Sequence, residues 1–386
     1  MSPNGRATTF MSAAGATYVQ EMEPLPGADP AQTRESATTS SPRPRGTIAG
    51  TIALLLVAVI SFLPTNFVVE SPGPVVNTLG ELDGHQLLSI KDAKTFETES
   101  QLDMTTVYVQ GGGQHRVTVP VILEALVNPT KDVVQEETVL PRGVTSDELS
   151  QQNDSLMASS QELSVAAALN ELQIPFTTTL QVVGFGDPLN QGALREGDEL
   201  EKINGEPIKD LAQLKQALTR QGTKPSTLTV KREGQSVDEE VSTAAAEDGT
   251  RQIGVFLKPE YTFPMDVNFG VEDIGGPSAG MMFALAIIDQ LTEGSLAGDT
   301  HVAGTGAITD DGKVEPIGGI AQKMAAAQRA GAEVFLAPAD NCPDVQDRVP
   351  KDLDVVKVST LAEARQALSR IASGTDPQQL PTCTLK

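Results

Sequence analysis

The sequence of 386 residues contains no tryptophan, three histidines and two cysteines, and aromatic residues make up only 4% of it. Two cysteines cannot complete a four-ligand zinc site, and the histidines lie far apart, at positions 85, 115 and 301. Hydrophobic residues still account for 39% of the chain, so sizeable cores can form without many aromatic side chains. We therefore expect two or three domains of ordinary size and no metal ion.

Basic residues are scarce as well: 28 Lys and Arg stand against 51 Asp and Glu, which gives a net charge of −23. Proteins bind nucleic-acid phosphates through clustered Lys and Arg, so this balance argues against a nucleic-acid partner. The pattern Gly-x-x-x-x-Gly-Lys-Ser/Thr, which cradles nucleotide phosphates, is missing from the printed sequence. We expect no ATP binding and no other cofactor.

The N-terminal region divides into a polar segment and an apolar one. Residues 1–45 are rich in Ser, Thr, Ala, Pro and Gly and predict a disordered tail. Gly46–Leu63 then carries no charged residue, and apolar residues return after Pro64. Because about 20 apolar residues span a bilayer, we expect a transmembrane helix within residues 46–69. A secretory signal peptide is the alternative, but the long tail and the lack of a clear small-x-small cleavage site favour an uncleaved anchor.

Charges beside this stretch predict its orientation. Arg43 and Arg45 precede it and Glu70 is the first charge after it, so the positive-inside rule places the tail in the cytoplasm. The chain after about residue 70 would then lie outside the cytoplasmic membrane, where disulfides persist. Cys342 and Cys383 both fall in that part, and we expect them to form a bridge; two free buried thiols are the alternative.

The rest of the chain separates by composition and periodicity. Residues 70–160 show no catalytic motif, and we expect them to form a connector or to add strands, at Met104–Gln110 and Arg116–Ile122, to a later sheet. Residues 250–375 alternate strand and helix patterns, which predicts an α/β (α+β) domain, and 376–386 form a C-terminal tail. The helices expected in this domain are Ala279–Leu291, Ile320–Ala330 and Leu361–Ile371, and the strands are Ile253–Leu257, Asp266–Val271, Val302–Gly304, Val334–Ala337 and Val355–Val358.

Residues 161–246 carry a pattern of their own. Gly-Asp and Asn-Gly turns frame a short strand within Ala193–Gly205, and Asp210 can cap the amphipathic helix that follows. The stretch Ala193–Gly205 resembles the signature of a PDZ domain, a family that binds extended peptides as an added strand beside a helix. The resemblance implies that Leu211, Leu214 and Leu218 line the peptide groove. The family's carboxylate-binding loop has no clear counterpart around Leu172–Phe176, so a role as a spacer stays open.

One serine stands in unusual surroundings. Gly275-Gly-Pro-Ser-Ala-Gly280 precedes a nearly unbroken apolar run, and Pro277 favours a helix start near Ser278. A hydroxyl at a helix N-terminus lies beside unpaired backbone N–H groups that can stabilise an oxyanion. The simpler interpretation is that Ser278 only caps the helix.

A nucleophilic serine requires a base. His301 is the only histidine after Ser278, and the predicted helix uses half of the gap, which leaves little room for the acid and base of a histidine triad. A lysine with its usual pKa of about 10.4 can act as a base only when burial lowers that pKa. Lys323 fits, because it lies in a run of small and apolar residues without an adjacent acid; a solvent-facing helix lysine is the alternative.

The order of these motifs resembles the proteolytic domain of the Lon family. Pro-Ser-Ala-Gly is followed by Gly304-Thr-Gly306 and then by the run Gly312–Gly331, which contains Lys323. The resemblance implies that Ser278 is the nucleophile, that Lys323 is the general base, and that Thr305 helps to hold them. Gly276, Pro277, Ala279 and Gly280 would shape the turn and its oxyanion site. Many family members carry an acid where this chain has Gly275; here the nearest acid upstream is Asp273.

Anchor, PDZ domain and Lon-type domain together resemble the ATP-independent, membrane-anchored Lon-like peptidases of bacteria. This resemblance implies a serine endopeptidase that cleaves unfolded or flexible protein segments outside the cytoplasmic membrane. It also implies a homo-oligomer, with a hexamer as one form. The competing interpretation is a non-catalytic protein-binding module in which the PDZ domain carries the function on a degenerate Lon-like scaffold.

Overall fold

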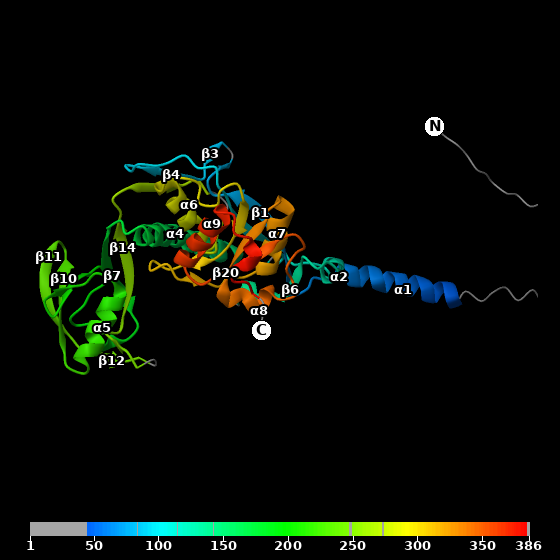
Figure 1. Ribbon diagram of the computed structural model, residues 1–386. Coiled ribbons are helices and arrows are strands. Elements are labelled where there is room, and N and C mark those ends of the chain that lie inside the picture. The colour runs from blue at the N-terminus through cyan, green and yellow to red at the C-terminus, as the bar shows by residue number, and fades with distance from the viewer. Residues whose placement is uncertain are drawn as a thin grey trace, which may run out of the picture. The chain divides into compact units, whose positions relative to one another are not determined.

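The computed structural model describes residues 45–82, 84–113, 115–141, 143–246, 249–271 and 274–383 (Figure 1). Its larger sheet has six strands in the order β20-β19-β16-β5-β1-β6. Strands β5, β16, β19 and β20 run parallel to one another, whereas β1 pairs antiparallel with both β5 and β6. The bounds are β1 Phe67–Asn77, β5 Gln101–Gln110, β6 Asp132–Gln135, β16 His301–Gly304, β19 Val334–Pro338 and β20 Asp354–Val358.

Helices cover both faces of this sheet. In β19, Val334 and Leu336 pack into one core cluster and Phe335 and Ala337 into another, as the two-residue period of a strand requires. The first cluster includes side chains from α4 (Ser146–Glu171), α6 (Gly280–Leu291) and α9 (Leu361–Ala372), and the second includes side chains from α7 (Ile320–Ala330) and α8 (Cys342–Val345). The result is a three-layer α/β arrangement.

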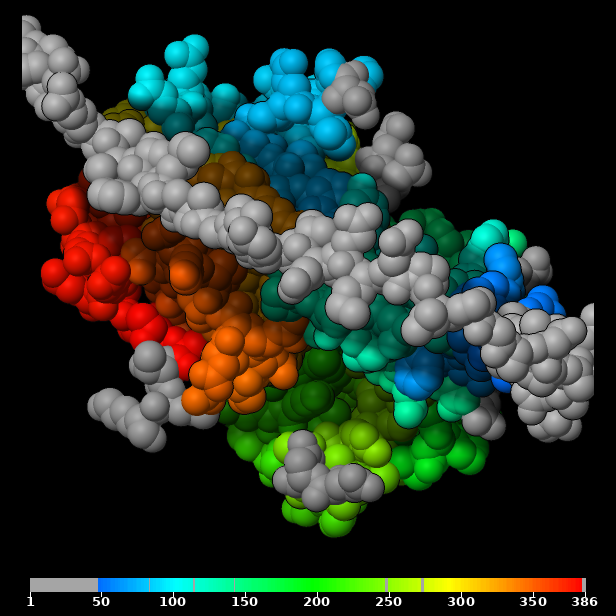
Figure 2. Space-filling view, turned by 90° about the vertical axis from the view of Figure 1, so that its right-hand side faces the viewer, coloured from blue at the N-terminus to red at the C-terminus, as the bar shows by residue number. Residues whose placement is uncertain are grey.

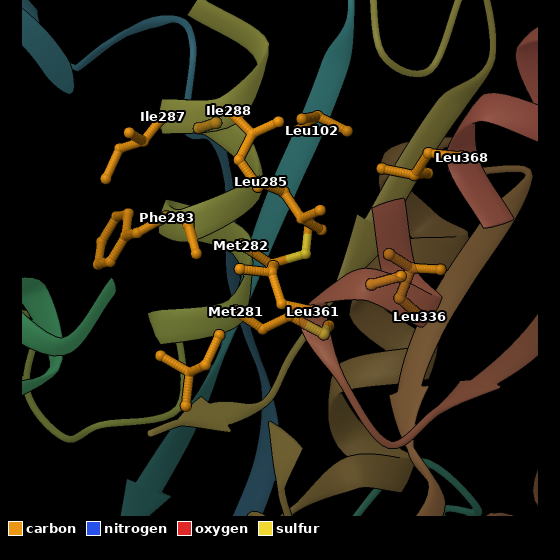
Figure 3. Packing of buried hydrophobic residues seen from close by; sticks show 14 of the residues in the cluster. Leu102, Met281, Met282, Phe283, Leu285, Ile287, Ile288, Leu336, Leu361 and Leu368 are labelled. Carbon is orange, nitrogen blue, oxygen red and sulfur yellow. The ribbon is translucent and has the colours of Figure 1, made fainter. Parts of the chain in front are cut away.

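Helix α6 lies at the centre of the first core. Every residue from Gly280 to Asp289 is buried, which is why this helix is apolar on all sides rather than amphipathic. Figure 3 shows Met281, Met282 and Leu285 of α6 facing the side chains of Leu336 in β19 and Leu361 in α9. The burial of α6 fixes the turn that precedes it beside Thr305 and Gly306, which directly follow β16.

Early and late parts of the sequence build this domain together. Strands β1, β5 and β6 precede residue 136 and β16, β19 and β20 follow residue 300, yet they share one sheet. In the space-filling view, blue surface from the early chain lies directly beside brown surface from the late chain (Figure 2). The segment between the two groups of strands includes a second sheet.

This second sheet has the order β11-β10-β8-β7-β14 and packs against helix α5 (Leu211–Gln221), which Asp210 caps. Its strands are β7 Thr177–Phe185, β8 Glu199–Ile203, β10 Ser226–Arg232, β11 Gln235–Val241 and β14 Val255–Thr262, with β9 Glu206–Pro207 paired to β8. We call residues 177–262 the second domain.

The bounds of the second domain differ from the prediction of 161–246. The strand expected at Ile253–Leu257 in the α/β domain is β14, which pairs along its length with β7 and extends to Thr262. At the other end, residues 161–171 belong to α4, whose buried face packs with α6 in the larger domain. Both errors have one cause, because strand and helix patterns do not indicate which core an element joins.

Two further predictions are corrected by the structure. The strand expected at Arg116–Ile122 is instead helix α2, Val119–Val127, with a proline in its first turn; the β-branched residues hid that start signal. The apolar stretch 46–69 is not one helix, because α1 (Arg45–Ser61) ends before Pro64 and Phe67–Val69 open strand β1. Residues 1–44 lie outside the described residues. Among those described, no helix combines the length and the apolar character needed to cross a lipid bilayer.

Short elements complete the fold. The strand expected at Asp266–Val271 forms β15 (Asp266–Phe269), which pairs with β4 (Leu88–Lys91) in a separate ribbon rather than in the large sheet. The others are β2 Glu81–Leu82, β3 His85–Gln86, α3 Glu136–Val139, β12 Ala244–Ala245, β13 Arg251–Gln252, β17 Ala307–Ile308 and β18 Val314–Glu315, with 3-10 turns at Pro188–Asn190, Ala339–Asn341 and Pro377–Gln379.

Candidate active site

Ser278 lies in the turn before α6, and helix α4 holds that turn at two points. The backbone N–H of Gly276 donates to the carbonyl oxygen of Asn153 over 3.0 Å. The hydroxyl of Ser160 donates to the carbonyl oxygen of Pro277, also over 3.0 Å. Gly276 has a φ of +89°, a conformation that glycine adopts without strain, so the turn depends on this residue.

The side chain of Ser278 does not cap the helix. The N-cap position belongs to Ala279, and no side chain caps the start of α6. The carbonyl oxygen of Ser278 accepts hydrogen bonds from the backbone N–H of Gly306 (2.8 Å) and from the hydroxyl of Thr305 (2.9 Å). These two bonds fix the backbone of Ser278 and leave its hydroxyl group free to face another partner.

That partner is Lys323. Its Nζ donates to Ser278 Oγ over 2.7 Å and to Thr305 Oγ1 over 3.0 Å. The side chain is 97% buried, with 3% exposed, and burial lowers its pKa from the ordinary value of 10.5 to about 7. A large part of the Lys323 population is therefore neutral near pH 7, and a neutral amine can accept a proton from a hydroxyl.

Local sequence places Lys323 at this point. Helix α7 begins after Gly319, whose φ of +67° is left-handed. A Cβ atom added to Gly319 would lie only 2.7 Å from a methyl group of Val107 in β5. Any larger residue would push the helix away from the sheet. Ile320 and Met324 of α7 are buried. Lys323 lies three residues after Ile320 and next to Met324, so it is on the same buried face of the helix.

His301 takes no part in this group. Its Nε2 lies 2.6 Å from Asp103 Oδ2 and 2.9 Å from Gln101 Nε2, at the start of β16. The imidazole ring of His301 thus contacts two side chains of β5 and not Ser278. Among the three histidines of the sequence, this was the only candidate for a triad, and its position agrees with the lysine alternative.

A cleft of about 370 Å³ opens over Ser278 and Lys323. One wall is strand β5 from Met104 to Val109, and the opposite side includes Ile274, Gly275 and the Gly318-Gly319 pair. Glu70 and Pro74 of β1 and Met157 of α4 complete the lining. A chain segment in this cleft can reach the hydroxyl of Ser278.

Backbone donors lie beside the serine. In the described part of the chain no group accepts a hydrogen bond from the N–H of Ser278 or Ala279. The N–H of Gly280 makes only a long bond of 3.4 Å, to the carbonyl oxygen of Pro277. Two adjacent unpaired N–H groups at a helix N-terminus form the arrangement that stabilises a developing oxyanion. Asp273, the nearest acid upstream, lies outside the described residues.

The predicted peptide groove of the second domain requires correction. Leu214 and Leu218 are only 1% and 2% exposed and belong to the core beneath α5, so they cannot contact a peptide. Leu211 is 41% exposed and remains accessible. The apolar face of the helix was visible in the sequence, but that pattern alone does not separate a groove from a core.

Cys342 and Cys383 form a disulfide that closes a separation of 41 residues. The bridge joins α8 to the C-terminal segment, where Thr382 pairs with Val356 of β20. Within the described ranges, no group of three or more His, Cys, Asp or Glu side chains could hold a metal ion.

No motif in the sequence indicates the residues that surround Ser278 and Lys323. Asn153, Met157 and Ser160 of α4, and Glu70 of β1, carry no local motif. Ser160 contacts the turn across 117 residues of sequence. Such partners emerge only when the fold brings the two segments together.

Comparison with known proteins identifies part of this chain. Residues 259–370 match the model of the Lon protease (S16) C-terminal proteolytic domain. The Lon protease of Roseiflexus castenholzii is 44% identical over 91 residues, which are 23% of this chain and 11% of that protein. The Lon protease of Rhizobium meliloti is 35% identical over 132 residues, which are 32% of this chain and 16% of that protein. The chain thus contains a Lon-type serine peptidase domain and spans only a small share of the length of these relatives.

Among solved structures, the chain matches the PDZ domain of an SdrC-like protein from Listeria monocytogenes, with a TM-score of 0.19 and 18% identity. The match covers 20% of this chain and 85% of that one. A PDZ domain of an SdrC-like protein from Listeria innocua also matches, with a TM-score of 0.19 and 16% identity, covering 20% of this chain and 92% of that one.

Proposed function

We propose that this chain is a serine endopeptidase in which Ser278 is the nucleophile and Lys323 is the general base. One observation carries the proposal: a buried amine with a pKa of about 7 lies 2.7 Å from the hydroxyl of Ser278. Near neutral pH such an amine accepts protons, while an ordinary lysine does not. The match of residues 259–370 to the Lon proteolytic domain supports the same assignment.

The reaction proceeds in two halves. Ser278 Oγ attacks the scissile carbonyl carbon, its proton moves to the neutral Nζ of Lys323, and the carbonyl electrons move to oxygen. The N–H groups of Ser278 and Ala279 stabilise this oxyanion. When it collapses, the C–N bond breaks and Lys323 donates its proton to the departing amine. Water, deprotonated by Lys323, then hydrolyses the acyl-enzyme and regenerates the hydroxyl.

Thr305 positions the base. Its hydroxyl donates to the carbonyl oxygen of Ser278 and accepts from Lys323 Nζ, so one residue holds both members of the dyad. The single lone pair of the neutral amine, 2.7 Å from Ser278 Oγ, can then accept the proton of that hydroxyl.

The substrate is an extended protein segment. Strand β5 pairs with β16 only as far as Met104, and Thr105 to Gln110 continue past the end of β16 along the cleft. Backbone groups in that part of β5 offer an edge to which an extended peptide adds as a strand. Folded substrates cannot enter as an extended strand, so unfolded or flexible segments are cleaved. ATP plays no part in this reaction.

The proposed location is outside the cytoplasmic membrane, with the N-terminal region as the anchor. The apolar side chains of α1 support this, since Leu54, Leu55 and Leu56 are all exposed. The Cys342–Cys383 disulfide supports an oxidising compartment. Membrane fractions washed with carbonate should retain the full chain, and a protease added to intact cells should remove its C-terminal part. Recovery in the soluble fraction would contradict the anchor.

The second domain acts as a PDZ-type module that recruits substrate. The exposed side chain of Leu211 and the edge strands of the sheet support peptide binding there. The proposal also includes a homo-oligomer, with the hexamer that the Lon resemblance implies. Deletion of residues 177–262 should then raise KM for protein substrates while short peptides are cleaved normally. Light scattering of the purified chain gives its molar mass and thus the number of subunits in the oligomer.

The decisive experiment compares the unaltered chain with four purified variants on an unfolded protein. Ser278→Ala and Lys323→Ala should each lower the cleavage rate by roughly a thousandfold or more. Ser155→Ala and Lys313→Ala are matched controls, because both residues are exposed and lie outside the cleft lining. Equal cleavage by Ser278→Ala and the unaltered chain would disprove the dyad. Peptide binding without cleavage by any form would favour a binding module.

A further inference from the structure

Glu70 is an acidic residue at the edge of the active-site cleft. It follows Val68 and Val69, which are both 1% exposed, and it lines the cleft together with Ser278 and Lys323. No motif or resemblance singled it out as a functional residue. Its partial burial distinguishes it from the many acidic residues that lie fully exposed on the surface of this chain.

The register of the sheet shows which way Glu70 projects. Glu70 lies opposite Val109 of β5, and directly opposite residues of an antiparallel pair share one face. Val107, two residues before Val109, is on that face as well, and its methyl group approaches Gly319 at the start of α7. The carboxylate of Glu70 is therefore on the face of the sheet toward α7, which is the side from which Lys323 reaches Ser278.

The charge of Glu70 has no partner within the described part of the chain, in which it forms neither an ion pair nor a hydrogen bond. Its neighbour across the sheet, Asp132, is already paired with Arg348 over 2.7 Å. Burial first, and then the charge of Asp132, raise the pKa of the Glu70 carboxyl. A partly buried carboxylate without a counter-ion is unfavourable, and an incoming cation offsets that cost.

The rest of the cleft suits a long cationic side chain. Among the described lining residues, Glu70 is the only acid and Lys323 the only base, and Lys323 is engaged with Ser278 and Thr305. Val107 and Val109 add apolar surface next to Glu70 on the same face. Lysine and arginine side chains pack their methylene stems on such surface while their charged ends reach a carboxylate.

We propose that Glu70 is a specificity-determining residue that binds the side chain of a Lys or Arg residue of the peptide substrate near the bond that Ser278 attacks. The inference rests on the proposed peptidase function and adds a preference for basic sequences to it. Arginine suits the site best, because its planar guanidinium group can donate two parallel hydrogen bonds to one carboxylate.

The test uses pairs of peptides that differ only in the charge of one side chain. Each pair carries either arginine or its neutral analogue citrulline, placed in turn at every position around one scissile bond, with acetylated N-termini and amidated C-termini. Acetylation removes the alternative cation, the terminal amine. At one position the unaltered chain should cleave the arginine peptide about tenfold faster in kcat/KM than its citrulline twin.

Variants assign that preference to a residue. Glu70→Gln keeps the shape of the side chain and should reduce the arginine-to-citrulline ratio of kcat/KM to about one. Glu81→Gln is the matched control, since Glu81 is exposed and lies outside the cleft lining, and should keep the tenfold ratio. An unchanged ratio in Glu70→Gln, or a ratio of one in the unaltered chain, would overturn the proposal.

A binding measurement separates this proposal from the peptidase proposal itself. Fluorescence anisotropy of labelled peptides on Ser278→Ala should show tighter binding of arginine than of citrulline, and Ser278→Ala/Glu70→Gln should lose the difference. If no form cleaves any peptide, the peptidase function fails, yet this pair of variants still tests the cationic subsite. Equal binding of both peptides to Ser278→Ala would refute it.

Discussion

The side-chain nitrogen of Lys323 lies 2.7 Å from the hydroxyl oxygen of Ser278, although 45 residues separate the two in sequence. Burial is the cause that lowers the pKa of this lysine, which has no carboxylate partner in the described structure. The burial that makes Lys323 a base in the proposed mechanism also imposes a free-energy cost on the folded state. The protonation state of Lys323 therefore affects both the proposed cleavage reaction and the stability of the fold, and both effects can be measured.

Replacing Lys323 by methionine should abolish cleavage and stabilise the fold. The folded pKa of about 7 lies below the unfolded value of 10.5, so below pH 7 both states hold the proton and the folded state bears the full cost. That cost is at most about 5 kcal/mol. It declines as pH rises from 7 and disappears above 10.5. Thermal unfolding at pH 6 should show a higher Tm for Lys323→Met than for the unaltered chain, and the gap should shrink by pH 9.5. A lower Tm at pH 6 would contradict the buried-amine cost.

Peptide cleavage should depend on pH with the same midpoint. Only the neutral amine accepts the proton of Ser278, so kcat/KM should rise about tenfold per pH unit below 7 and level off above it. The measurement is a profile from pH 5.5 to 9 on a citrulline peptide, which avoids titration effects at the cationic subsite. A rate that stays constant from pH 5.5 to 8 would show that Lys323 is not the base.

Thr305→Val should lower kcat with little change in KM. Valine has nearly the shape of threonine but loses the bonds to Lys323 Nζ and to the carbonyl oxygen of Ser278. We expect a decrease of about tenfold to a hundredfold, since a misplaced base misses the reacting geometry. Thr305→Ser keeps the hydroxyl and should retain activity within a few fold. Equal losses in both variants would point to packing rather than to the hydroxyl.

Removal of the Cys342–Cys383 bridge should destabilise the C-terminal segment. Closing a loop of 41 residues removes enough unfolded-state entropy to stabilise the fold by about 4 kcal/mol in the chain-entropy model. Cys342→Ala/Cys383→Ala, or reductant added to the unaltered chain, should therefore lower the free energy of unfolding, measured by urea denaturation, by a similar amount. Mass spectrometry after alkylation without reductant should find no labelled cysteine; two labelled thiols would refute the bridge in solution.

Local signals in the sequence predicted some elements accurately. Helix α7 was expected at Ile320–Ala330 and is found there, because Gly319 and Gly331 mark both ends with left-handed conformations. The Lon resemblance singled out Ser278 and Lys323 from sequence motifs alone, and the structure brings these two side chains within 2.7 Å of each other. Each of these inferences depends on a short stretch whose meaning does not require the rest of the fold.

Other features depend on long-range contacts that no local pattern encodes. Pro120 opens a helix where valines suggested a strand, and Leu214 faces a core where a groove was expected. Asn153 and Ser160, the partners of the turn that holds Ser278, come from a helix more than a hundred residues earlier. Their role follows from packing between α4 and α6, which sequence periodicity cannot specify.

The part of the chain that matches the Lon proteolytic-domain model is shorter than the part that builds the cleft around Ser278 and Lys323. A fragment covering residues 259–370 would include Ser278 and Lys323 but would lack α4, which holds the turn, and β1 and β5, which wall the cleft. Transfer of residues 259–370 alone to another protein would carry Ser278 and Lys323 without the helix and strands that position them. The second domain therefore lies, in sequence, between the two groups of strands that share the other sheet, and a fragment from either side of it would lack part of the cleft lining.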